Sequence, residues 1–550
     1  MTGGAVDPAE IWTFAVLITL LLLLGFVAAR WRRPQRPLTL EEWGVGGRAF
    51  GNWVTWFLLG GSMYTAYTYV AVPALTYGAG AIGFFAIPFA IITTPLVYLV
   101  STRVWSVSHA HGFVTASEFV RARFGSRGLG ALVAIVSLAA TMPYIAVQLV
   151  ALQALLKTIG ITGDWPLVMA MVVTALCTFQ SGLRAPALLS IAKEVLLTWL
   201  VLSLLVLIAA GGGLRRGFDA AQTRFTNDAS PTTGLLLPEG GELNYLTLIV
   251  GSALAIFVYP HAVTAILAAR DRATIKRNAA ALPLYCLILG LLALLGFVAI
   301  GTSVRPVGGD LNTVTPKLFH ELFPPWYAGF GYTVIAVSAV IPAAVMSIAA
   351  ANLFTRSIYR AYLRPRATER EEARVSRYTS LLVKFGALGC IVLLSPQFSI
   401  ELQLIGGVVI LQAIPAAMIG LWTAWFHRWA LVAGLLTGLA AGLWLLYQLP
   451  QRAPDGRIIK AHFGSSSLPL AELELPTKAA VYVGVVALVV NLLVVVAATI
   501  LLRSLRVPSG VDRTRPADYL ADADDPALPR LDQLVDGLPH RHRGVHARQR

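Results

Sequence analysis

The chain has 550 residues, of which 57% are hydrophobic and only 13% are charged. Its apolar residues fall in repeated runs of roughly 20, the length that crosses about 30 Å of hydrocarbon, so an ordinary water-soluble domain is excluded. The formal net charge of +15 is typical of Lys and Arg gathered in the loops on one side of a membrane, and it does not indicate nucleic-acid binding.

The apolar runs predict an all-α, multi-pass protein of the cell membrane with about 13 transmembrane helices. The first run, "IWTFAVLITLLLLLGFVAA", follows acidic residues and is too long for a signal-peptide core, so we expect a retained helix. None of the runs shows the alternation of a barrel strand. The expected helices are centred near residues 20, 65, 92, 140, 172, 200, 256, 290, 340, 387, 410, 438 and 490.

Arginine-rich segments such as "ARWRRPQRP" and "ARDRATIKR" fall on one side of this arrangement, which the positive-inside rule makes cytoplasmic. The N-terminus is then expected outside the cell and the C-terminus in the cytoplasm. The last segment, residues 504–550, is charged and contains several prolines, a composition that predicts a disordered tail with at most a weak contact to anionic lipid.

The second expected span contains the stretch "GGSMYTAYTYVAVP", Gly60 to Pro73, which is crowded with glycines, hydroxyls and tyrosines. A helix broken at membrane depth frees backbone groups, and this is tolerated only where they line a polar cavity. The pattern favours a binding site at a break, or alternatively a small-residue face that packs on a neighbouring helix.

A second candidate break lies in "GSALAIFVYPHAV", where Pro260 removes a helix hydrogen bond and His261 is costly in lipid unless it faces a polar interior. The alternative for His261 is a buried ring bonded to a carbonyl. Two interrupted spans, five spans apart, fit an inverted repeat with a transport site where the halves meet.

Several motifs together resemble the sodium:solute symporter family: "AAVMSIAAANLFTRSIYR", "GGRAFGNWVTW", "SGLRAPALLSIAKE" and "FVYPHAV". The resemblance covers about residues 40 to 430. Within this family, "FLLGGSMYTAYTYVAVPALTYGAGA" and "ATMPYIAVQLVALQ" are most similar to the monocarboxylate permease branch.

The resemblance implies a leucine-transporter-like core of two inverted five-helix repeats and alternating access around a midplane site. The implied function is cation-coupled uptake of small monocarboxylates such as lactate, pyruvate, acetate or propionate, or of another small solute such as an amino acid. No enzymatic activity and no cofactor are expected, only a transported sodium ion or proton. The expected parts are an N-terminal helix and link (1–50), two repeats (51–215 and 244–420), two further helices (428–503) and the tail (504–550).

The family's sodium site, carried over to this sequence, falls on the carbonyls of Gly61 and Tyr64, the backbone of Ala344 and the hydroxyl of Ser347. The next family ligand falls on Ile348, whose side chain offers no oxygen to a hard cation. Lys193 is a candidate to place its ammonium where sodium would sit, and so to couple transport to protons. Alternatively, Lys193 extends to the interface or pairs with Glu194.

Aromatic walls with a few hydroxyl or amide donors suit a short carboxylate. Two of the candidates have simpler alternatives, since Tyr144 follows a proline and Gln412 could bond a neighbouring helix. Glu401 and Gln403 are expected at the interface. The candidate substrate-binding residues are Tyr64, Thr65, Thr68, Tyr144, Tyr259, His261 and Gln412.

Overall fold

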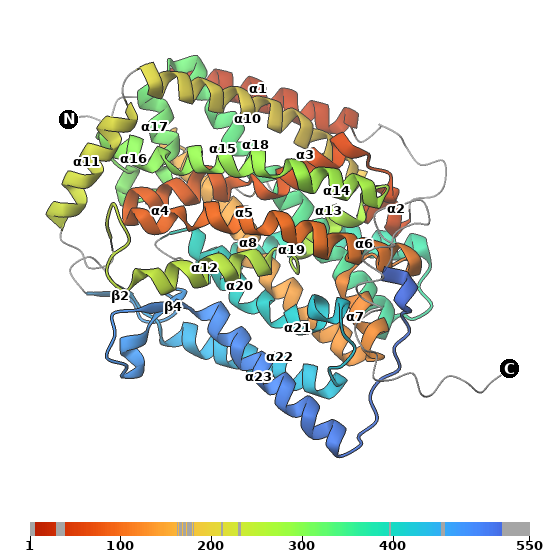
Figure 1. The fold of residues 1–550 in the computed structure, drawn as a ribbon. Coiled ribbons are helices and arrows are strands. Elements are labelled where there is room, and N and C mark those ends of the chain that lie inside the picture. Colours follow the sequence, from red (N-terminus) through yellow and green to blue (C-terminus); the bar gives the residue numbers. More distant parts are fainter. Residues whose placement is uncertain are drawn as a thin grey trace.

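A computed structural model describes residues 6–28, 39–161, 181–210, 213–228, 233–394, 398–452 and 457–519, with a few single positions between 163 and 179. This part of the chain is built almost entirely from helices that run side by side (Figure 1). The helices of its first half are α1 (Pro8–Ala28), α2 (Leu40–Gly44), α3 (Asn52–Met63), the π-helix η2 (Tyr67–Ala71), α4 (Val72–Ala79), α5 (Ala86–Leu96), α6 (Thr102–His111), α7 (Ala116–Phe124), α8 (Arg127–Thr158), α10 (Arg184–Ala210) and α11 (Gly213–Asp228).

The second half continues the helical arrangement and adds two short hairpins before the last helix. Its elements are α12 (Gly241–Ala255), α13 (Pro260–Leu267), α14 (Arg272–Ala281), α15 (Pro283–Ala293), α16 (Leu295–Gly301), α17 (Val314–Leu322), α18 (Pro325–Leu353), the π-helix η7 (Phe354–Leu363), α19 (Glu369–Leu394), α20 (Ile400–Ile410), α21 (Ile414–Ala417), η9 (Ile419–Leu421), α22 (Arg428–Gln448), β1 (Gln451–Arg452), β2 (Ile458–Lys460), β3 (Ser467–Pro469), β4 (Ala480–Tyr482), α23 (Val483–Ser504) and η11 (Pro516–Tyr519). The hairpins β1–β2 and β3–β4 are antiparallel.

Nine of the described helical segments are long and apolar enough to cross a membrane, or ten if the bent pair α12–α13 is one span. The spans expected near residues 65 and 387 correspond to α3 and α19, which are not among the nine. The span expected near residue 172 falls mostly outside the described residues. The total of about 13 therefore stays a prediction.

Helix α18 lies at the centre of the bundle, and 94% of its apolar window is buried. It packs against α1, α8, α10 and α19. Its C-terminal part is a run rich in small residues, "AAVMSIAAANL", which lets neighbouring helices approach closely. Pro342 lies inside this helix without ending it, and the regular turns give way only at the π-helix η7.

Both expected breaks are present. Helix α3 ends at Met63, and Tyr64 has non-helical dihedrals (φ −91°, ψ 85°) before the chain resumes as the π-helix η2. Helix α12 ends at Ala255, and α13 starts afresh at Pro260 with a bend of 45° between the two axes. Proline suits the first helical position because its missing N–H has no partner to lose there.

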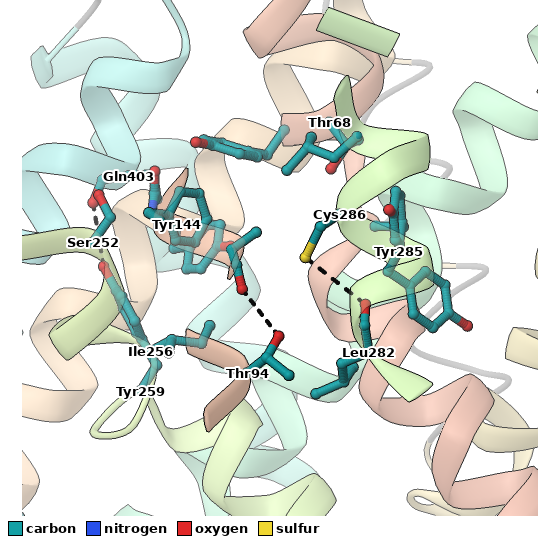
Figure 2. A pocket seen from close by; sticks show the side chains of 15 residues that line it. Thr68, Thr94, Tyr144, Ser252, Ile256, Tyr259, Leu282, Tyr285, Cys286 and Gln403 are labelled. Carbon is teal, nitrogen blue, oxygen red and sulfur yellow. Dashed lines mark hydrogen bonds between the residues drawn. The ribbon is translucent and has the colours of Figure 1, made fainter. Parts of the chain in front are cut away.

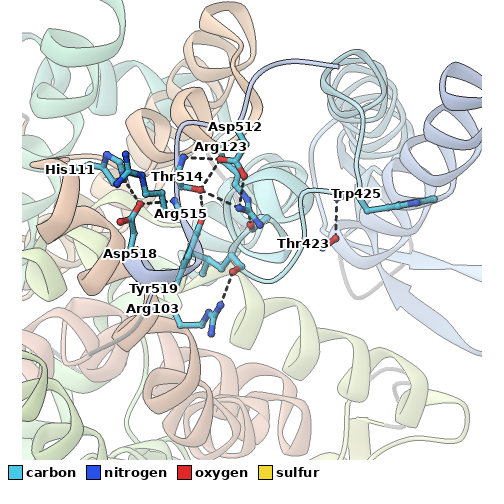
Figure 3. Close-up of polar contacts among 12 residues, drawn as sticks. Arg103, His111, Arg123, Thr423, Trp425, Asp512, Thr514, Arg515, Asp518 and Tyr519 are labelled. Atoms are coloured by element: carbon cyan, nitrogen blue, oxygen red, sulfur yellow. Dashed lines mark hydrogen bonds and ion pairs between the residues drawn. The ribbon is translucent and has the colours of Figure 1, made fainter. Parts of the chain in front are cut away.

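The beginning of the C-terminal tail differs from the expectation of disorder after residue 504. Residues 505–507 continue the end of α23, and residues 510–519 pack against α6 and α7 (Figure 3). Asp512 pairs with Arg123 at 2.7 Å and Asp518 pairs with His111 at 2.7 Å. Tyr519 is buried beside Arg123, whose guanidinium lies 5.2 Å from its ring centre. The charged composition predicts a solvated tail, whereas Asp512 and Asp518 have partners at the ends of α7 and α6.

Candidate transport site

The two breaks meet at one cavity, whose empty space is about 600 Å³ including its mouth (Figure 2). Tyr67 and Thr68 reach it from the break after α3, and Ile256 and Tyr259 reach it from the break after α12. The remaining walls come from α5, α8, α12, α15 and α20. The lining residues are Tyr64, Tyr67, Thr68, Phe89, Ala90, Thr94, Tyr144, Ser252, Ile256, Tyr259, Leu282, Tyr285, Cys286, Leu289 and Gln403.

Aromatic rings dominate the cavity and lie in contact with one another. The rings of Tyr64 and Tyr285 have centroids 4.8 Å apart, and those of Tyr144 and Tyr259 are 5.0 Å apart. The buried hydroxyl of Tyr67 has no hydrogen-bond partner among the described residues. Since none of the described residues in this lining has an acidic or basic side chain, the cavity offers neutral donors and apolar walls, which suit a small solute with one polar end.

Four of the seven candidate substrate residues, Tyr64, Thr68, Tyr144 and Tyr259, line this cavity. Thr65 is not part of the lining, and its hydroxyl accepts hydrogen bonds from Tyr67 N at 3.1 Å and from Gln148 Nε2 at 3.3 Å.

His261 and Gln412 also lie outside the lining. The buried ring of His261 packs edge-on against Tyr144, 5.2 Å between centroids, and neither ring nitrogen has a hydrogen-bond partner in the described structure. Gln412 donates to its own helix at Val408 O (2.9 Å) and accepts from Asn491 Nδ2 (3.1 Å). Gln412 therefore has the packing role that was its alternative interpretation.

The sequence interpretation missed Tyr285, Thr94, Ser252 and Gln403. Gln403 was expected at the interface, yet it lines the cavity, where Tyr259 donates to its backbone carbonyl at 3.2 Å. Its side-chain Oε1 is buried and has no partner among the described residues. A polar residue in the first turn of an apolar helix gives no sign of the face it occupies, so hydropathy alone could not locate it.

Lys193 on α10 is fully buried, and its ammonium lies at the break after α3. It donates to the carbonyl oxygens of Gly61 at 3.1 Å and Tyr64 at 2.6 Å, and it lies 2.9 Å from Glu194 Oε1. The side chain therefore does not extend to the interface, although the pairing with Glu194 is present. Carbonyls freed by the broken helix are satisfied by this buried cation.

The oxygens carried over from the family's sodium site have other partners here. The carbonyls of Gly61 and Tyr64 accept from Lys193, and Ser347 Oγ donates to Ala344 O at 2.8 Å. Ile348 is buried and supplies no oxygen. A sodium ion binds several free oxygen ligands at once. With the Lys193 ammonium in this position, these oxygens do not fit such an ion.

A helical membrane protein with two helices broken around a shared cavity, and with a buried cation on the freed carbonyls, has the architecture of a secondary transporter. The model of the sodium:solute symporter family matches residues 43–441, and the chain belongs to this family. The family resemblance drawn from the motifs is confirmed.

Two relatives and one solved structure show how far the similarity extends. The chain is 45% identical over 443 residues to a monocarboxylate transport permease protein of Rhizobium johnstonii, covering 80% of this chain and 89% of the relative. It is 24% identical to the sodium/proline symporter of Escherichia coli over 70% of this chain and 77% of that one. A Na⁺-coupled sialic acid symporter structure superposes with a TM-score of 0.66 at 14% identity, covering 92% of this chain and 99% of the other.

These similarities establish the fold and the class of the protein. The core has the leucine-transporter fold, as the family resemblance implies, and the chain is a cation-coupled symporter rather than an enzyme. A small solute and a coupling cation are its substrates.

Proposed function

We propose that the protein takes up small monocarboxylates, such as lactate, pyruvate, acetate or propionate, by symport with protons. The observation that carries the coupling half of this proposal is the position of the Lys193 ammonium between the carbonyls of Gly61 and Tyr64. The proposed substrate class is supported by the lining of the cavity and by the similarity to the monocarboxylate transport permease protein of Rhizobium johnstonii.

The cavity favours a carboxylate over the alternative, an amino acid. Tyrosine and threonine hydroxyls can donate to a carboxylate, and the apolar side chains of Phe89 and Leu289 suit a short carbon chain. An amino acid would also bring an ammonium group, and the described lining residues include no aspartate or glutamate to receive it.

Proton coupling follows from what Lys193 does in its two protonation states. When charged, Lys193 supplies the cation that the freed carbonyls require, as sodium does in the family pattern. When it gives up its proton, the positive charge leaves the break, and the carbonyls of Gly61 and Tyr64 lose their ionic partner. Loss of the charge at this break alters the cavity wall, because Tyr64 both contacts Lys193 and lines the cavity. A sodium-driven cycle is the alternative and requires the ammonium to leave this position.

The topology expected from charge is part of this proposal, whereas the gradients of the proton and the solute set the direction of transport. Under this proposal the N-terminus faces outward, the C-terminus and the arginine-rich loops face the cytoplasm, and the repeats span residues 51–215 and 244–420. Protons then enter down their gradient together with the acid.

Purified protein in liposomes tests both halves of the proposal. We expect labelled pyruvate to accumulate when the interior is alkaline in sodium-free buffer, with competition by lactate, acetate and propionate but not by proline. Protein-free liposomes correct for passive entry of the acid. Uptake that requires sodium would overturn proton coupling, and an absence of competition among short acids would overturn the substrate class.

A further inference from the structure

The break after α3 leaves both backbone carbonyls and backbone N–H groups without partners in the helix. The carbonyls of Gly61 and Tyr64 accept from Lys193, as described above. The N–H groups just after the break, those of Ala66 and Tyr67, need acceptors of their own, because an unsatisfied donor at membrane depth is costly.

Gln148, on α8, supplies the acceptor for the first of these N–H groups. Its side chain is buried, and its Oε1 accepts from Ala66 N at 3.0 Å. Its Nε2 donates to Thr65 Oγ1 at 3.3 Å, and that hydroxyl accepts from Tyr67 N at 3.1 Å. One amide therefore supports three consecutive residues of the break.

We infer that Gln148 is a positioning residue for substrate binding, acting through the broken segment rather than on the solute. The break is held from two helices: Lys193 on α10 binds its carbonyl side and Gln148 on α8 binds its N–H side. The chain at and directly after these two attachments places Tyr64, Tyr67 and Thr68 on the cavity wall. Gln148 itself does not belong to the lining.

The same arrangement links the cation site at Lys193 to the solute cavity. Because Gln148 fixes the N–H side of the break to α8, a change at Lys193 displaces the carbonyl side relative to a fixed point. The cavity wall then moves with the carbonyls, and cation and solute binding are linked. This step rests on the proposed function, whereas the positioning role does not.

Two substitutions and their combination test the positioning role. Gln148→Met keeps the length of the side chain and removes all its hydrogen bonds, including a long one from Nε2 to Tyr144 O of its own helix at 3.5 Å. Thr65→Val removes the hydroxyl between Gln148 and Tyr67. Thr141→Val is the matched control, because Thr141 is buried on the same helix and, in the described part of the chain, its hydroxyl bonds only to Ser137 O of that helix, at 2.7 Å.

The readout is solute exchange in liposomes, in which labelled and unlabelled pyruvate exchange without any gradient. We expect Gln148→Met to raise the KM about tenfold and to leave the maximal rate within about twofold of the parent. A misplaced cavity wall weakens the binding of the solute, whereas the rate of the transport cycle does not depend directly on this contact. The loss in the double variant should be smaller than the sum of the two single losses, because both changes act on one hydrogen-bond network. An unchanged KM, an equal effect of Thr141→Val, or additive losses in the double variant would each overturn the inference.

Hydrogen–deuterium exchange separates a failure of this inference from a failure of the proposed function. The amides of residues 64–71 should exchange faster in Gln148→Met than in the parent or in Thr141→Val, whether or not pyruvate is the substrate. If pyruvate is not transported but this exchange rises, the proposed function fails and the positioning role stands. If the exchange does not change, the positioning role fails.

Discussion

The ammonium of Lys193 lies 2.6 Å from the carbonyl oxygen of Tyr64, and the ring of the same tyrosine is part of the cavity wall. One residue at the break therefore touches both the buried cation and the space for the solute. In a symporter the two binding events must depend on each other, and a shared residue is a direct physical means of achieving this.

Replacing Lys193 with methionine should abolish accumulation of pyruvate driven by a pH gradient. Methionine fills most of the same volume, but it offers no charge to the carbonyls of Gly61 and Tyr64, which stay buried without a donor. The measurement is uptake into sodium-free liposomes with an alkaline interior. Full accumulation by Lys193→Met would exclude the lysine from coupling.

Removing the ammonium and restoring an oxygen should convert the break into a sodium site. The double variant Lys193→Ala and Ile348→Ser frees the carbonyls of Gly61 and Tyr64 and adds a hydroxyl next to Ser347, at the position where the family pattern has one. We expect pyruvate uptake stimulated several-fold by sodium, which neither single variant shows. Uptake indifferent to sodium would mean that these oxygens do not form a common site.

The hydroxyl of Tyr67 should contribute to carboxylate binding, because it lines the cavity and has no protein partner among the described residues. We expect Tyr67→Phe to raise the KM for pyruvate about tenfold, the usual cost of one hydrogen bond to a charged group. Tyr69→Phe is the matched control, since Tyr69 lies on the same π-helix and is buried but does not line the cavity. Equal effects of the two variants would assign the loss to packing.

The breaks could be read from the sequence because their causes are local. Glycines and hydroxyls at Gly60 to Thr65 weaken a helix where they stand, and Pro260 can only start a new one. The contact of Lys193 with Gly61 and Tyr64 was anticipated from the family resemblance rather than from spacing, since nothing in a hydropathy pattern says which helices are neighbours.

The other residues of the cavity could not be predicted from their local sequence. Gln403 and Tyr285 reach it because of how α20 and α15 are rotated in the bundle, and rotation is set by packing against neighbours. Gln412, an amide in an equally apolar run, turns instead to Asn491 on α23. The sequence environments of the two glutamines do not distinguish these outcomes.

The segment that follows α23 should be held in place by Tyr519, whose ring is 3% exposed and lies beside the guanidinium groups of Arg103 and Arg123 (Figure 3). We expect Tyr519→Ala to release residues 505–519, because the substitution removes the one large buried ring of this segment together with its bond to Thr514 at 2.8 Å. Limited proteolysis in detergent should then cleave between residues 505 and 519 about tenfold faster than in the parent. Val511→Ala is the control, since that side chain is 75% exposed and its loss should leave cleavage unchanged. Equal cleavage of the Tyr519→Ala variant and the parent would show that the ion pairs of Asp512 and Asp518 suffice to hold the segment.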